Sequence, residues 1–233
     1  LLISLVAGSL LMLSRRRWAW AGLLAGLATA VAPVAVAMVP ACAVAAFLEI
    51  RRRGWTDREA RRSLWAPILS PLGLICFGIF LWFWCGTPLA SYKAQNVEWS
   101  ESSTPLAIPR VFGSLIHQIF IRGVGRHGPG GIDLNGILAL LGTIFLFYGL
   151  WRLWKVRGTL PLTAWVWTVG AAFLALTSAK TPPNPRMLIC AFPVVLIVGA
   201  EAQGRARRWI LAADVSCLLL MTWFTYVGQW LRP

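Results

Sequence analysis

Long apolar stretches alternate with short basic clusters along this chain of 233 residues. The apolar stretches cover residues 1–14, 18–48, 64–92, 134–151, 160–179, 187–200 and 209–231, and Asp214 is the one charged residue inside them. A helix needs about 20 residues, at ~1.5 Å each, to cross a hydrocarbon layer of ~30 Å. Most of the stretches reach or approach that length. The pattern predicts an all-α fold, a polytopic transmembrane helical bundle of about seven or eight segments.

The basic residues gather where membrane helices are expected to end. The four clusters are Arg15–Arg17; Arg51–Arg53 with Arg58, Arg61 and Arg62; Arg152, Lys155 and Arg157; and Arg205, Arg207 and Arg208. A net charge of +14 would indicate nucleic-acid binding in a water-soluble protein, but a hydrophobic content of 58% and 14 Trp argue against that class. We interpret the clusters as cytoplasmic ends of helices, with the lipid bilayer as partner and no nucleic acid. The oligomeric state is not indicated.

The stretch of residues 18–48 is long for one crossing and short for two. If it bends near Ala32 and Pro33 into a hairpin, 15 of the 22 basic residues share one face and seven lie on the other. If it crosses once, the division is 12 against 10. The hairpin gives the stronger bias, and Pro33 and Pro40 each remove a helical hydrogen-bond donor. We therefore predict the hairpin, with one long kinked helix as the alternative.

We treat residues 1–233 as one membrane domain and expect it to be the C-terminal portion of a longer protein, because the chain begins inside an apolar stretch without Met. In the hairpin topology, residues 85–133 form an extracytoplasmic loop. Gly86-Thr87-Pro88 predicts a turn at its start, and the apolar spacing of residues 108–121 predicts an amphipathic helix on the membrane surface. A second external segment contains Pro182, Pro183 and Pro185.

Three blocks of the sequence resemble, in the same order, a known family. They read WAGLLAGLATAVAPVAVAMVPA, PLGLICFGIFLWFWCGTPLASYKAQNVEW and TPPNPRMLICAFPVVL, and the resemblance covers roughly residues 19–200. The most specific parts are Gly86-Thr87-Pro88-Leu89 with Ala94-Gln95 and Trp99, and Pro185-Arg186-Met187-Leu188 with Ala191-Phe192-Pro193. In these parts the chain resembles bacterial relatives of the GPI mannosyltransferase 2 (PIG-V-type) family, which are integral-membrane glycosyltransferases of the GT-C class.

The resemblance implies an enzyme of a bacterial inner membrane that transfers a sugar, mannose in the family, from a polyprenyl-phosphate donor at the extracytoplasmic face. Relatives use an acidic residue in the first external loop, and no part of this chain matches that loop. Relatives also carry a polar or basic residue next to the proline where this chain has Ala30-Val31-Ala32-Pro33. A non-catalytic membrane subunit of the same fold, and a transporter or flippase of lipid-linked sugars, remain alternatives.

The candidate site residues all belong to the expected external face. Arg186 and Lys180 flank a proline-rich turn, where they would bind a lipid phosphate, and Arg122 would help to steer the donor. Tyr92, Gln95 and Trp99 would share one face of a helical segment 85–99 and contact the sugar. Glu98, Glu101 and Asp133 are weak candidates for the catalytic base. The two His and five Cys show no metal-ligand spacing, and no cofactor is indicated.

Each of these residues also has an ordinary membrane-protein explanation. Lysine and arginine at helix ends extend towards lipid headgroups, and Tyr and Trp form aromatic belts at the membrane surface. The carboxylates lie in a hydrophilic loop, where solvation alone accounts for them. The sequence therefore supplies candidates for a sugar-phosphate site and leaves the catalytic base open.

Overall fold

The computed structural model describes residues 1–98, 113, 134–156, 158, 160–177, 189–201 and 204–226. The elements found there are helical: α1 Leu2–Ser14, α2 Trp18–Val31, η1 Pro33–Ala37, α3 Met38–Arg53, α4 Arg58–Ser63, α5 Trp65–Leu69, α6 Leu72–Cys85, α7 Ala90–Glu98, α9 Leu134–Lys155, α10 Leu162–Leu176, η2 Ile189–Ala191, α12 Phe192–Glu201 and α13 Gly204–Tyr226. No strand occurs in these ranges. The all-α prediction is confirmed for this part of the chain.

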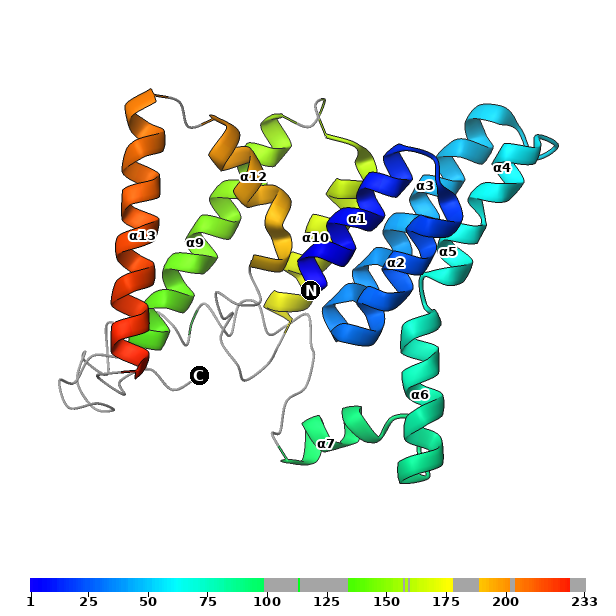
Figure 1. Ribbon diagram of the computed structural model, residues 1–233, viewed down its shortest axis with the longest axis horizontal. Helices are drawn as coiled ribbons and strands as arrows, with labels where there is room; N and C mark the ends of the chain where they lie inside the picture. The colour runs from blue at the N-terminus through cyan, green and yellow to red at the C-terminus, as the bar shows by residue number, and fades with distance from the viewer. Residues whose placement is uncertain are drawn as a thin grey trace.

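The chain turns back between α2 and α3. Ala32 is extended (φ −154°, ψ 141°) because the following Pro33 disfavours the helical conformation, and η1 then leads into α3. The two helices run in opposite directions (Figure 1). Arg16, just before α2, lies 3.7 Å from the Glu49 carboxylate near the end of α3. A single helix would hold these residues about 50 Å apart, so the predicted hairpin is confirmed and the long kinked helix is wrong.

Small residues line the contacts between helices. The main core lies between α1, α2, α3 and α10 and contains nine buried alanines, together with larger side chains such as Val6, Met38 and Trp167. The hydroxyl of Ser9 on α1 donates to the Ala21 carbonyl of α2 at 2.8 Å. A second cluster joins α9, α10 and η2 through Leu146, Leu176 and Ala191. Small side chains let helix backbones approach closely, which is the usual way in which membrane helices pack.

The segment from Arg58 to Cys85 is one helical run of 28 residues with bends. Pro71 has no N–H to give to the Pro67 carbonyl, and the Ser70 hydroxyl donates to that carbonyl instead, at 3.1 Å. Thr29 of α2 donates to the Ser70 carbonyl at 3.2 Å and so ties α2 to the joint between α5 and α6. The helix expected to start at Leu64 therefore begins earlier, inside the basic cluster, and it ends at Cys85, where the loop of residues 85–133 was expected to start.

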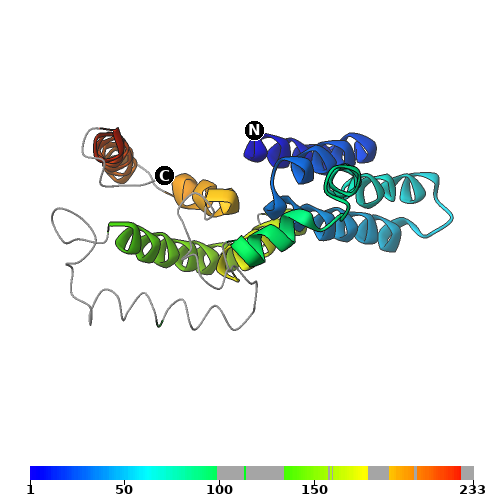
Figure 2. The ribbon, with the colours of Figure 1, turned by 90° about the horizontal axis from the view of Figure 1, so that it is seen from below.

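The helix-connecting turns lie at two opposite ends of the bundle (Figure 1). One end holds the α1–α2 turn, the end of α3, the end of α9 and the start of α13. This end is basic, because the last turns of α3 and α9 carry Arg51–Arg53, Arg152 and Lys155. The other end holds the end of α6, α7, the end of α10 and η2, and α6 and α7 reach farthest out. Figure 2 shows the same bundle from below, with α13 apart from the core helices. We call these the basic end and the α7 end.

Candidate functional site

The α7 end is shaped by a sharp corner after α6. Gly86 adopts a left-handed conformation (φ 72°, ψ −2°), which glycine tolerates best, and its N–H donates to the Trp82 carbonyl at 2.9 Å. After Thr87-Pro88 the chain enters α7, which runs sideways away from α6 (Figure 1). The turn predicted at Gly86-Thr87-Pro88 is confirmed. The continuous helix expected over residues 85–99 is wrong, because Gly86 ends α6 and a new helix begins at Ala90.

The sequence-derived candidates are only partly inside the described residues. Tyr92 lies on α7 with 55% of its surface exposed, and Gln95 and Glu98 occupy later backbone positions of the same helix. Tyr92 and Gln95 are one helical turn apart, as predicted. The other candidates lie outside the described residues: Trp99, Glu101, Arg122, Asp133, Lys180 and Arg186, together with the surface helix expected at residues 108–121 apart from Gly113, which is helical.

The residues that flank the proline-rich segment are described, and they show where it begins and ends. Thr177 follows α10 and Ile189 begins η2, and both elements reach the α7 end (Figure 1). The Trp167 indole N–H of α10 donates to the Cys190 carbonyl at 3.1 Å, which fixes η2 against α10. The structure therefore brings α7, the end of α10 and the start of η2 towards the same end of the bundle.

The basic end carries a network of ion pairs around Glu49. This carboxylate is nearly buried, with 9% of its side chain exposed, and lies 2.6 Å from Arg53 Nε and 3.7 Å from Arg16 Nη1. Asp57 caps α4 by accepting a hydrogen bond from the Glu59 amide at 2.9 Å. That hydrogen bond, with help from Arg53, lowers the pKa of Asp57, so the cap keeps its charge to more acidic pH than an ordinary aspartate would. The network ties the α1–α2 turn, α3 and α4 together.

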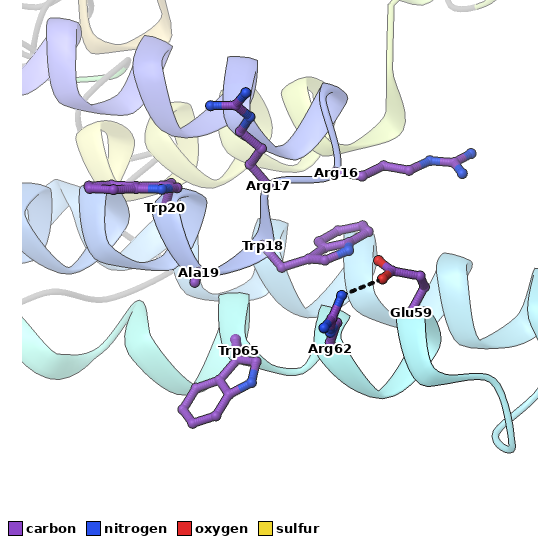
Figure 3. Close-up of a pocket in the computed structure, with 8 residues that line it drawn as sticks. All are labelled: Arg16, Arg17, Trp18, Ala19, Trp20, Glu59, Arg62 and Trp65. Atoms are coloured by element: carbon purple, nitrogen blue, oxygen red, sulfur yellow. Dashed lines mark hydrogen bonds and ion pairs between the residues drawn. The ribbon is translucent and has the colours of Figure 1, made fainter.

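A cavity of about 480 Å³ opens beside this network (Figure 3). It lies between the start of α2 and the α4–α5 segment, and three tryptophans, three arginines, a carboxylate and an alanine line it: Trp18, Trp20, Trp65, Arg16, Arg17, Arg62, Glu59 and Ala19. Arg62 Nη1 lies 2.7 Å from Glu59 Oε1 across one wall. Trp18 is 7% exposed, and its indole nitrogen is buried without a hydrogen-bond partner among the described residues.

Sequence reasoning missed this cavity because it treated the arginines only as markers of topology. The available signal was the tryptophan next to each of two basic clusters, Trp18 after Arg15–Arg17 and Trp65 close to Arg62. No group of three His, Cys, Asp or Glu side chains is arranged to hold a metal ion within the described ranges. No family model, curated protein or solved structure matches the chain.

Proposed function

We propose that this chain is a multi-pass membrane protein with its basic end in the cytoplasm. The observation that carries this proposal is the helical run Arg58–Cys85, whose most apolar window has a mean hydropathy of 2.1 and is only 6% buried. In α6, Phe77, Phe80 and Phe83 are exposed, and none of its residues is buried. Such a helix has no polar face to offer to water, whereas a bilayer accommodates it on all sides.

Two helical runs in the described residues, Pro33–Arg53 and Arg58–Cys85, are long and apolar enough to cross a membrane. We extend the number of crossings to eight by adding α1, α2, α9, α10, α12 and α13, which alternate in direction along the chain (Figure 1). Helices of 13 to 15 residues such as α1, α2 and α10 span only about 20 Å. Local thinning of the bilayer and packing against longer neighbours would accommodate them.

The enzyme activity that we propose is transfer of a sugar, of the mannose type, from a polyprenyl-phosphate donor at the extracytoplasmic face. Its support is the resemblance to the PIG-V-type family, together with the common end shared by α7 and the flanks of residues 178–188. The described parts of the two most specific blocks, Gly86–Leu89 with Gln95 and Ala191-Phe192-Pro193, therefore lie towards one side of the bundle. If the resemblance were only a chance similarity between apolar helices, the two blocks would have no reason to lie on the same side.

In this reaction an acceptor hydroxyl attacks the anomeric carbon of the sugar, and the bond from that carbon to the phosphate oxygen breaks. The polyprenyl phosphate leaves with the bonding electron pair, and a carboxylate takes the hydroxyl proton. Arg186 and Lys180 would stabilise the departing phosphate, with Arg122 steering the donor, and Tyr92, Gln95 and Trp99 would contact the sugar. Glu98, Glu101 or Asp133, or an acidic residue outside residues 1–233, would be the base.

The test is transfer from radiolabelled polyprenyl-phosphate mannose in membranes that contain the chain together with any upstream region of its gene. We expect Arg186→Ala to reduce transfer about 100-fold, because one donor to a developing negative charge contributes about that much. Arg110→Ala is the matched control, since Arg110 has the same charge on the same expected side and lies outside the resembling blocks. Equal effects of the two substitutions would refute the role of Arg186.

The alternatives predict different outcomes of the same assay. A non-catalytic subunit gives membrane insertion without transfer. A flippase gives no transfer but moves labelled lipid-linked sugar across sealed vesicles. Either result replaces the enzyme proposal and leaves the membrane topology unchanged.

A further inference from the structure

The cavity at the basic end has the composition of an anion site. The guanidinium groups of Arg16, Arg17 and Arg62 contribute three positive charges and Glu59 one negative charge, so the lining carries a net charge of +2. Arg62 is paired with Glu59 at 2.7 Å, and Arg16 is 3.7 Å from Glu49. Arg17 is exposed and extends from the turn on the side of Trp18 away from Arg62 (Figure 3). The lining therefore holds more positive charge than its own carboxylate neutralises.

A buried hydrogen-bond donor faces this cavity. Trp18 is more than nine-tenths buried, and its Nε1 has no acceptor among the described residues. In Figure 3 the nitrogen-bearing edge of its indole is turned towards the side of the cavity where Arg62 and Glu59 pair. An unpaired buried N–H costs about 1–3 kcal/mol, and an acceptor entering the cavity would remove that cost.

The start of α2 adds further donors. Trp18, Ala19 and Trp20 begin this helix of 14 residues and also line the cavity. No side chain caps the helix, and its first turn contains no acidic residue. The first N–H groups of an α-helix have no partner within the helix, and the helix dipole favours a negative charge there.

We propose that this cavity binds the phosphate group of an anionic phospholipid in the cytoplasmic leaflet. Phosphate is a compact anion with several acceptor oxygens. It can therefore accept hydrogen bonds at the same time from one indole N–H, from the free amides of the helix and from arginine guanidinium groups. Arg17 would rotate towards the phosphate, as exposed side chains do on a fast timescale. The site lies at the end of the bundle opposite α7, so it is separate from the proposed sugar-transfer face (Figure 1).

The tryptophans favour a lipid headgroup over free phosphate. Trp20 and Trp65 line the cavity while 61% and 53% of their surfaces remain exposed. They lie beside the basic turns, at the level where headgroups would be in the proposed orientation. Tryptophan concentrates at that depth because its ring is apolar and its N–H is polar. The lipid source rests on the membrane placement proposed above and does not depend on sugar transfer.

The test is native mass spectrometry of the purified full chain in detergent, titrated with phosphatidylglycerol and, as the neutral comparison, phosphatidylcholine. We expect Arg17→Gln and Trp18→Phe each to weaken phosphatidylglycerol binding about tenfold, the size expected for loss of one hydrogen bond to a charged group. Arg15→Gln is the matched control, because it removes the same charge from the same turn outside the cavity. Glu59→Gln should tighten binding by removing the repelling carboxylate.

The outcomes separate the sources of the anion. If millimolar inorganic phosphate displaces the lipid at the wild-type site but not from Arg17→Gln, the site takes phosphate from either source. If it displaces nothing, the site is specific for lipid. Equal weakening by Arg15→Gln and Arg17→Gln, with Trp18→Phe unchanged, would mean diffuse attraction and overturn the proposal. Thermal unfolding of each variant shows whether it is folded, and Arg17 is exposed enough to be replaced without disturbing the core.

Discussion

Gly73→Ala is expected to destabilise the protein by about 3 kcal/mol or more, at or above the upper end of the usual range for overpacking. A methyl group on Gly73 would overlap the Gly26 carbonyl oxygen and would lie 2.6 Å from the Ala30 nitrogen and 2.8 Å from Thr29 Oγ1. Two of these three atoms belong to the backbone of α2, so no side chain can move aside. The helices must separate, and the bond from Thr29 to the Ser70 carbonyl would lengthen with them.

Gly78→Ala is the matched control on the same helix. A methyl group there meets nothing closer than the Pro88 carbonyl oxygen at 3.9 Å, which is an ordinary contact. Alanine is also a better helix former than glycine by about 1 kcal/mol. Unfolding of both variants in mixed detergent micelles measures the difference. Equal stability of the two variants would show that α2 and α6 do not approach as closely as described.

Glu49→Gln is expected to cost about 2 kcal/mol, because it removes the charge that Arg53 and Arg16 share. The carboxylate is 9% exposed and its oxygen lies 2.6 Å from Arg53 Nε, so solvent screens this pair weakly. Without the charge, Arg16 and Arg53 face each other with no carboxylate between them. The contact that closes the α2–α3 hairpin at the basic end is then lost.

Glu59→Gln makes the same chemical change at an exposed pair and is the control. Glu59 and Arg62 are 41% and 52% exposed, although their 2.7 Å separation is nearly as short as that of Glu49 and Arg53. Exposed ion pairs contribute little, so we expect a change below about 1 kcal/mol. The midpoint of thermal unfolding at low salt reports both variants. A larger loss for Glu59→Gln than for Glu49→Gln would contradict the role assigned to the buried carboxylate.

The hairpin could be predicted from the sequence because the prediction depends on how the basic residues of the whole chain divide between the two faces of the membrane. The distribution of arginines needed both ends of residues 18–48 on one face, and Pro33 offered a place to turn. The 3.7 Å contact from Arg16 to Glu49 is the direct consequence. The long helices were equally visible, since they lie in apolar stretches bounded by charges or prolines, whereas the short polar helices α4 and α7 were not.

Element ends and the cavity were harder to predict. The apolar pattern started the expected helix at Leu64, whereas the helical run begins at Arg58, inside the basic cluster. The cavity depends on Trp18 of α2 and Arg62 of α4 lining the same space, and the approach of distant positions leaves no local pattern in the sequence. An indole nitrogen without a partner is visible only once the packing around it is known.

The most direct test of the central claim is labelling of single cysteines with a membrane-impermeant maleimide. In a variant without native cysteines, Thr56→Cys would report the α3–α4 turn at the basic end and Lys93→Cys would report α7; both positions are exposed. In intact spheroplasts we expect labelling at position 93 and none at position 56, and in inverted vesicles the reverse. Labelling of both positions from the same side of the membrane would contradict the topology on which the proposed function rests.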